Sequence, residues 1–172
     1  MTRPQPLTVM EVEREEHEIE RSSHAIYGLV IITATLVAER EAVTDAVTSL
    51  LVLWGAGVVL LLAHLYSAAV AQAGERGRWL SHAERHLLIV DNVPVLMALV
   101  VPSILIALAG VSVLELALAI DVSIVLSLVA LFAVGAYQAH KQGASLALKL
   151  GIGILGAITG LVVVLLEVIL SH

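Results

Sequence analysis

Apolar residues are gathered into five long stretches along the chain, with short polar connections between them. The stretches cover residues 25–38, 47–71, 87–109, 111–137 and 144–170. A helix needs about 20 apolar residues to cross roughly 30 Å of hydrocarbon, and the last four stretches reach this length. The first is shorter, so either its ends are enclosed by protein or it joins the preceding segment and spans with polar ends. The pattern predicts an all-α, polytopic membrane protein with five transmembrane helices.

The segment before the first stretch, residues 1–24, is polar and acidic. Its Glu and Arg residues recur at helical spacing, and a thin apolar stripe runs through Val12, Ile19 and Ile26. The segment lacks the Lys-rich face of a membrane-surface helix and the basic start of a signal peptide. We therefore expect a cytoplasmic acidic helix, packed on protein or standing in the cytosol, ahead of a membrane domain over residues 25–172.

Positive charges set the expected orientation. Eight of the nine Lys and Arg residues lie before the first stretch, between the second and third, or between the fourth and fifth, and only Arg40 lies on the other side. Because Lys and Arg are retained in the cytoplasm, the N-terminus is predicted inside and the C-terminus outside. The expected location is the cell inner (plasma) membrane, as a multi-pass protein.

Composition agrees with a membrane domain and removes several function classes. The chain is 59% hydrophobic with only 14% charged residues, which lies outside the range of soluble domains. It has no cysteine, so thiolate metal sites are excluded, and its net charge of -6 argues against nucleic acid as a partner. It has no metalloprotease His-Glu-x-x-His pattern and no Ser–His–Asp order, so we expect no enzyme activity. The expected surroundings of the apolar helices are membrane lipid.

Prolines and glycines shape the packing of the last three stretches. Pro94 and Pro102 should kink the third, and the short link 109–112 makes the third and fourth an antiparallel hairpin. The fifth opens with glycines that superficially match a dinucleotide-binding pattern, but no strand precedes them, so close helix approach explains them better. These are Gly151, Gly153, Gly156 and Gly160. Five short helices rarely enclose a path alone, so we expect a dimer, with the Gly156/Gly160 face as its interface.

Ionisable groups inside a span cost about 2.5–3.5 kcal/mol or more each, so each needs a partner or a function. A cytoplasmic-side layer of polar residues comprises His24, Tyr27, His64, Tyr66, Asp91, Asn92 and His140. His64 and Asp91 lie at comparable depth on consecutive helices, so a contact between them is geometrically easy. Such a pair can bind a divalent metal, relay a proton or neutralise itself. A purely structural His–Asp–Tyr clamp is the alternative.

A second polar layer, mostly acidic, is expected on the outer side. Its carboxylates would concentrate cations at an external mouth, although ordinary solvated helix ends also explain Glu41 and Asp45. The layer comprises Glu39, Glu41, Asp45, Glu115 and Glu167. Asp121 lies about 10 residues, ~15 Å, into the fourth stretch. It either faces a polar pathway or pairs with one neighbouring side chain. Thr33 and Thr35 either offer hydroxyls to an ion or bond back to their own helix.

Histidines and carboxylates form two further groups on the cytoplasmic side. One shares a face of the acidic helix and consists of Glu13, His17, Glu20 and His24. The other is His82 and His86, four residues apart before the third stretch. Imidazole and carboxylate suit Fe, Mn or Zn, although a Glu-rich helix also yields such spacing by chance. A divalent metal ion is therefore the one cofactor that the sequence suggests.

The chain resembles the vacuolar iron transporter family in three features. These are the run from Tyr27-Gly28-Leu29-Val30 to Leu36-Val37-Ala38, the five-span layout with the N-terminus inside, and a glycine-rich last helix after Gly135-Ala136. The resemblance implies a five-helix metal transporter. Tyr27 stands where that family has Asp, the acidic and methionine ligands of its second helix have no clear counterpart around His64–Ser67, and residues 72–86 occupy the place of its metal-binding hairpin.

Two other groups share shorter patterns with the chain. Tyr27-Gly28-Leu29-Val30, Trp54, Ala63-His64-Leu65-Tyr66 and Pro102 are similar to a group of uncharacterised small actinobacterial membrane proteins, a comparison that implies no function. A weaker similarity, through Arg21, Thr35-Leu36-Val37, Asn92, Pro102 and Gly110, links the chain to small bacterial potassium channels with a Phe-Ser-Asp signature. Ile26-Tyr27 stands in place of Ser-Asp here, and one span is missing.

The sequence thus favours an ion transporter for a divalent transition metal (Fe, Mn or Zn), with proton exchange as a coupling mode. In this hypothesis His64 and Asp91 form the inner site, Asp121 a deeper stop, and Glu39 and Glu115 the outer mouth. The Glu13/His17/Glu20/His24 face would collect or sense metal inside. Two alternatives stay open: a monovalent cation or proton channel, which would not need the histidines, and a structural or regulatory subunit of another membrane protein.

Overall fold

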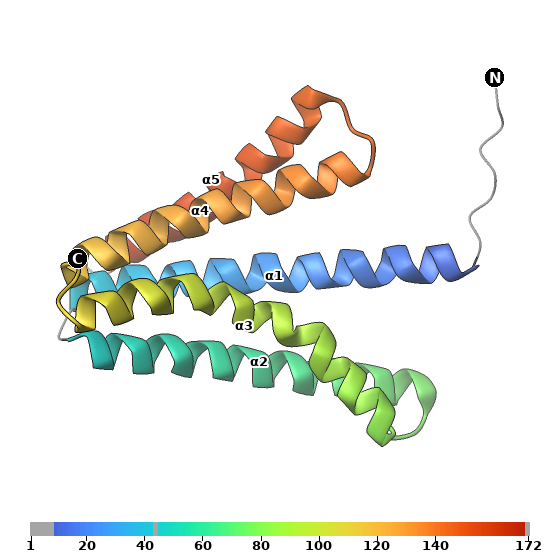
Figure 1. Cartoon of the computed structure of the whole chain (residues 1–172). Helices are drawn as coiled ribbons and strands as arrows, with labels where there is room; N and C mark the ends of the chain where they lie inside the picture. The colour runs from blue at the N-terminus through green and yellow to red at the C-terminus, as the bar shows by residue number, and fades with distance from the viewer. Residues whose placement is uncertain (1–8, 43–44, 171–172) are drawn as a thin grey trace.

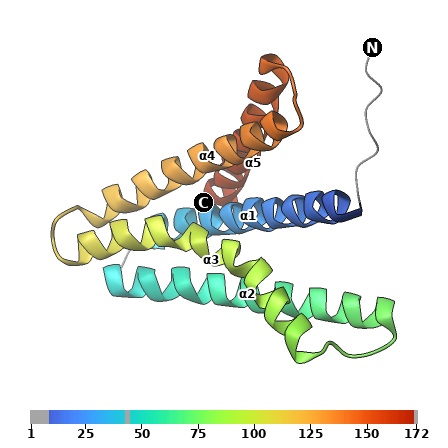
Figure 2. The same ribbon diagram turned by 45° about the vertical axis from the view of Figure 1, so that its right-hand side comes forward.

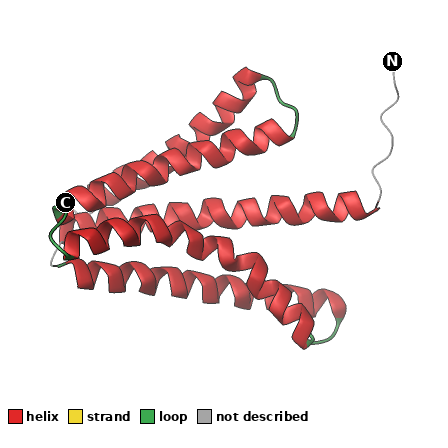
Figure 3. Ribbon diagram, in the orientation of Figure 1, coloured by secondary structure: helices red, strands yellow, loops and turns green. Residues whose placement is uncertain are grey.

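The computed structural model describes the backbone of residues 9–42 and 45–170 and the side chains of residues 26–42, 45–93 and 95–169. Within these residues the elements are all α-helices, as expected from sequence (Figure 3). They are α1 (Val9–Ala42), α2 (Ala46–Arg76), α3 (His82–Gly110), α4 (Leu116–Lys141) and α5 (Leu146–Leu170). Helices satisfy every backbone N–H and C=O within one segment, which hydrocarbon surroundings require.

Three of the described helices, α2, α4 and α5, are long and apolar enough to cross a membrane, and α3 is a fourth if its two bent parts form one span. Much of their apolar surface is exposed. In α5 only 11% of the residues in the most apolar stretch are buried inside the protein. A soluble protein rarely exposes so large an apolar surface, so the chain is a helical membrane protein.

Helix α1 joins the acidic segment to the first apolar stretch without a break. It packs against all four other helices and lies between the α2–α3 pair and the α4–α5 pair (Figures 1 and 2). Ile32, Thr33 and Leu36 of α1 are completely buried. Because protein rather than lipid encloses this helix, its apolar part can be shorter than that of a lipid-facing span.

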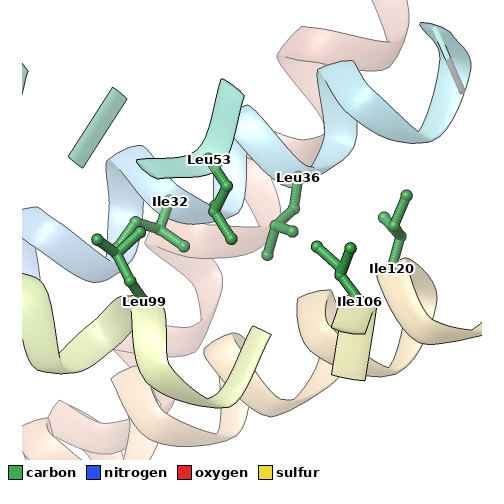
Figure 4. Packing of buried hydrophobic residues seen from close by; sticks show 6 residues of the cluster. All are labelled: Ile32, Leu36, Leu53, Leu99, Ile106 and Ile120. Carbon is green, nitrogen blue, oxygen red and sulfur yellow. The ribbon is translucent and has the colours of Figure 1, made fainter. Parts of the chain in front are cut away.

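A cluster of buried apolar side chains joins four helices (Figure 4). It consists of Ile32 and Leu36 of α1, Leu53 of α2, Leu99 and Ile106 of α3, and Ile120 of α4. We call the end of the bundle with the α1–α2 and α3–α4 connections the outer end. The opposite end, with the α2–α3 and α4–α5 turns, is the inner end. The two helix pairs lie close together at the outer end and diverge toward the inner end (Figures 1 and 2).

Helix α3 bends by 42° between its parts His82–Val93 and Val95–Gly110. The bend confirms the kink expected at Pro94, because proline supplies no N–H to the helical hydrogen-bond ladder. The second part continues as one helix through Pro102. It packs on α2, where Trp54 Nε1 donates a hydrogen bond of 2.9 Å to Ser103 Oγ.

Helix α4 begins later than the hydropathy pattern indicated. The fourth stretch was expected to start at Val111, but residues 111–115 form the connection and the helix starts at Leu116. Within this connection Ser112 adopts a left-handed conformation with φ of 61°, which reverses the chain direction after α3. Hydropathy alone missed the turn because Val111 and Val113 within it are as apolar as the helices that it joins.

The α5 glycines face α4 of the same chain. A Cβ atom on Gly156 would lie 2.9 Å from the carbonyl oxygen of Leu131, and one on Gly153 would lie 3.0 Å from that of Phe132. Gly160 similarly faces the Leu131 side chain. The close helix approach expected from these glycines is confirmed. Their assignment to a dimer interface was wrong, because α4 already occupies the Gly156/Gly160 face.

Gly156→Ala should destabilise the protein, because the added methyl group would press against a backbone oxygen that cannot move aside. We expect a loss of about 1–3 kcal/mol, as for other overpacked contacts. Gly151→Ala is the matched control, since nothing lies within 4 Å of its Cβ position. That variant should be neutral or gain up to about 1 kcal/mol of helix propensity. Thermal unfolding of both variants in detergent makes the comparison, and equal melting temperatures would contradict the packing described.

Candidate functional site

A groove of about 490 Å³ lies between α1 and α2 toward the inner end. Its α1 wall is Tyr27, and its α2 wall consists of Leu60, Ala63, His64, Ser67, Ala68 and Ala71. These α2 residues recur at helical spacing, so they form one face of the helix. The space exists because alanine and serine occupy positions where larger side chains would fill it.

His64 is the ionisable side chain of this groove, and it is half-buried. Its Nδ1 lies 3.3 Å from the Leu60 carbonyl oxygen, and its ring centroid lies 5.1 Å from that of Tyr27, with the planes tilted by 51°. In the tautomer that carries the proton on Nδ1, this nitrogen donates a hydrogen bond to the Leu60 carbonyl oxygen. In the neutral ring Nε2 is then the nitrogen with the lone pair, the one able to accept a proton or bind a metal.

The other expected inner-layer residues have different surroundings. Tyr66 is 74% exposed and does not line the groove, which suits an aromatic ring at a membrane interface. Asp91 is half-buried on α3, and its contact with His64 stays a prediction. Asn92 is buried; its Nδ2 donates to the Leu88 carbonyl oxygen at 2.8 Å, and its Oδ1 has no hydrogen-bond partner among the described residues. Sequence reasoning missed Ser67, although its position one helical turn after His64 indicated the same face.

At the outer end, Arg40 of α1 and Asp121 of α4 form a two-bond ion pair. Arg40 Nε donates to Asp121 Oδ1 at 2.7 Å, and Nη2 donates to Oδ2 at 3.3 Å. Of the two environments considered for Asp121, the structure thus shows a partner side chain, and a role for Asp121 as a deeper stop on an ion path stays a prediction. The expected depth was wrong, since α4 starts at Leu116 and places Asp121 only about 8 Å along the helix.

The remaining outer residues act mainly at helix ends. Asp45 caps α2 by accepting from the backbone N–H of Thr48 and Val47 at 3.0 and 2.9 Å and from the Thr48 hydroxyl at 2.7 Å. These bonds, those from Thr48 first, hold the pKa of Asp45 below its ordinary value. Glu115 is the N-cap residue of α4 but makes no side-chain cap bond. Glu39 is half-buried in the last turns of α1.

The two threonines of α1 bond back to their own helix, one of the two possibilities that the sequence left open. Thr33 Oγ1 donates to the Leu29 carbonyl oxygen at 2.7 Å, and Thr35 Oγ1 donates to that of Ile31 at 3.0 Å. These bonds use the hydroxyl hydrogens locally, as is common for threonine in apolar helices. Thr33 and Thr35 thus have a local structural role.

The structure describes the side chains of two of the six expected metal ligands. His82 and His86 are exposed near the start of α3. Among the side chains of residues 26–42, 45–93 and 95–169, no group of three or more His, Asp or Glu residues lies close enough to hold a metal ion. The side chains of Glu13, His17, Glu20 and His24 lie outside the described residues, while their backbone belongs to α1.

The α2–α3 turn is held by the carboxylate of Glu84. It accepts hydrogen bonds from Arg78 Nη2 and Nη1 at 2.8 and 3.0 Å, from Arg76, and from the Ser81 backbone N–H at 2.6 Å. Ser81 Oγ in return accepts from the Glu84 backbone N–H, which completes a capping box at the start of α3. The Arg78 guanidinium and the Ser81 bonds hold the pKa of Glu84 well below its ordinary value of 4.5.

Comparison with known proteins finds no relative: no protein-family model, no curated protein and no solved structure matches the chain. The resemblance to vacuolar iron transporters therefore stays a prediction.

The Arg40–Asp121 pair should be energetically coupled. Arg40→Ala and Asp121→Ala should each lower the melting temperature, because each leaves the other charge without its partner, and the double variant should lose less than the sum of the two. Glu41→Ala, an exposed carboxylate near Arg40, should have little effect. Thermal unfolding of the wild type, the two single variants and the double variant in detergent measures the coupling as a double-mutant cycle. Strictly additive losses would show that the pair contributes nothing to stability.

The hydrogen-bonded Glu84 carboxylate should make the stability of the protein fall at acid pH. The folded state keeps Glu84 ionised below its ordinary pKa of 4.5, so its contribution is present above pH 4.5 and is lost progressively as the pH falls below that value. Glu84→Gln should lower the melting temperature at pH 7 and flatten its decline below pH 4.5. Glu75→Gln, at an exposed position of α2, is the control and should keep the wild-type pH profile.

Proposed function

We propose that the chain is a small transporter that moves a cation across the plasma membrane, with the groove at His64 and Tyr27 as its inner binding site. The observation that carries this proposal is the position of His64 in α2, a helix suited to crossing the membrane, beside a groove of about 490 Å³. Ionisable residues within spans are rare and costly and usually mark a pathway. A histidine needed only for packing would not require an adjacent open space.

In this proposal the chain crosses the membrane five times, with the N-terminus inside and the C-terminus outside. The first crossing is the apolar part of α1, which the other four helices enclose. Eight of the nine Lys and Arg residues then lie on the cytoplasmic side. The inner end of the bundle, where the His64 groove opens, would face the cytoplasm.

A divalent transition metal is the proposed substrate. Glu13, His17, Glu20, His24 and Tyr27 follow each other by three or four positions along α1, so they share one helical stripe. Tyr27 is the last residue of this series, and its ring lies 5.1 Å from that of His64 in the groove. Imidazole and carboxylate ligands suit Fe, Mn or Zn. Metal binding to an imidazole requires the neutral ring and releases protons, which makes proton exchange a natural form of coupling.

A second candidate, a structural or regulatory membrane subunit, is favoured by the ion pair at the outer end. Arg40 and Asp121 neutralise each other there, and in this second candidate their ion pair serves to tie α1 to α4. In a subunit of this kind His64 would be a packing residue of α2. It would then affect assembly and stability without binding any ion.

Metal-dependent thermal stability distinguishes these functions. A metal that binds only the folded protein should raise the melting temperature by about 5–10 °C at 100 times its Kd. We expect this shift with Fe(II), Mn(II) or Zn(II), but not with Mg(II) or K⁺. His64→Ala should remove the shift and His17→Gln/His24→Gln should reduce it, whereas Tyr66→Ala, an exposed position two residues from His64, should keep it.

Other outcomes would contradict the metal site. A shift that persists unchanged in His64→Ala would place the metal elsewhere. No shift with any ion at millimolar concentration would support the subunit reading, and a shift with K⁺ alone would support a monovalent cation channel. Liposome flux assays with the responding ion would then test transport directly.

A further inference from the structure

The groove at His64 is much larger than a bare metal ion. Its volume is about 490 Å³. One water molecule occupies about 30 Å³ of liquid, so a divalent ion with six waters needs roughly 200 Å³. The room comes from Ala63, Ser67, Ala68 and Ala71, small residues that line the groove where larger ones would fill it. A metal ion therefore fits here together with its first shell of water.

The described lining of the groove offers few atoms that could replace this water. His64 carries one imidazole, Tyr27 and Ser67 carry one hydroxyl each, and the other four lining side chains are leucine and alanine. Sites that hold a metal without its water use three or four protein ligands. Removing the whole shell from a divalent ion costs far more free energy than one imidazole returns. An ion in this groove would keep most of its water.

Ser67 differs from several other hydroxyl residues of the apolar helices. Thr33, Ser123 and Ser127 donate to backbone carbonyl oxygens four residues earlier in their own helices, at 2.7 to 2.9 Å. Ser67 is exposed and lines the groove, and within the described part of α2 its hydroxyl makes no such bond. It lies three positions after His64, so both side chains share one face of the helix. Its hydroxyl is thus placed to bond a water molecule on an ion held at His64.

We propose that the groove binds a divalent metal ion as an aqua complex, with His64 as the protein ligand and Ser67 as the residue that positions the bound water. This inference rests on the proposed function and names the form in which its substrate binds. The Ser67 hydroxyl bonds a coordinated water from α2, and the Tyr27 hydroxyl faces the same shell from α1. Such water-mediated contacts are nearly as favourable as direct hydrogen bonds. A retained water shell also lets the ion leave, because few bonds to the protein must break.

Binding of Mn(II) to the full chain in detergent tests the proposal, with the water-proton relaxation rate and the melting temperature as readouts. Waters on a slowly tumbling Mn(II) ion relax solvent protons efficiently, so a bound aqua complex should raise the relaxation rate per Mn(II) severalfold above that of the free ion. Ser67→Ala should weaken Mn(II) binding about three- to tenfold, as expected for the loss of one hydrogen bond. Ser67→Thr keeps a hydroxyl and should retain binding.

A second variant tests the space that the water shell needs. Ala63→Leu places a larger side chain in the groove and leaves His64 in place, so it should also weaken Mn(II) binding. Ala147→Leu makes the same change at an exposed position of α5 outside the groove. Thr159→Ala removes a hydroxyl from α5 that bonds to its own helix. Both controls should bind Mn(II) as the wild type does.

The outcomes separate this inference from the proposed function. A melting temperature that rises with Mn(II), without an increase in relaxation rate per bound ion, would show an ion without its water and overturn the inference alone. Wild-type Mn(II) binding in both Ser67→Ala and Ala63→Leu would do the same, provided that His64→Ala still removes the shift. A shift with Zn(II) but none with Mn(II) would also overturn the inference alone. No shift with any transition metal would overturn the proposed function as well.

Discussion

Helix α1 begins among acidic residues and contains only a short apolar stretch. It lies between the α2–α3 and α4–α5 pairs, and its Ile32, Thr33 and Leu36 side chains are completely buried by the other helices. The other helices can then remain apolar on their outward faces, where lipid covers them. Helix α1 contacts all four other helices and so connects the two helix pairs.

Packing inside a membrane cannot depend on the hydrophobic effect, since lipid chains are as apolar as the helix surfaces. Close approach of backbones replaces it here. Gly153 and Gly156 let α5 reach the backbone of α4, and Gly57 similarly makes room on α2 for Leu99 of α3. At the outer end the Arg40–Asp121 pair adds an electrostatic tie between α1 and α4. The inner ends of the two pairs diverge, and the His64 groove lies in that half of the molecule.

The polar residues of the membrane domain divide into two kinds. Asp45, Thr35, Asp121 and Glu84 are satisfied by helix backbone or by arginine, so they stabilise ends and crossings. His64 differs, because its ring lies beside open space and meets the aromatic ring of Tyr27 from a different helix. Asn92 also differs, since its buried Oδ1 has no hydrogen-bond partner among the described residues. At the outer end, Asp121 and Asp45 already have structural partners in Arg40 and in the start of α2.

The sequence by itself determined the all-α class, the approximate helices and the kink at Pro94, because each depends on local periodicity, hydropathy or a missing N–H. It also indicated that the α5 glycines serve close packing, since a side chain one hydrogen in size has few other uses in a membrane helix. Only the tertiary structure decided which helix those glycines meet, where α4 begins, and that Asp121 pairs with a residue 81 positions earlier. The partner of a side chain depends on how helices far apart in sequence are placed, and hydropathy carries no information about that placement. For the same reason the sequence located Tyr27 and His64 separately, and the crossing of α1 and α2 brought their rings together.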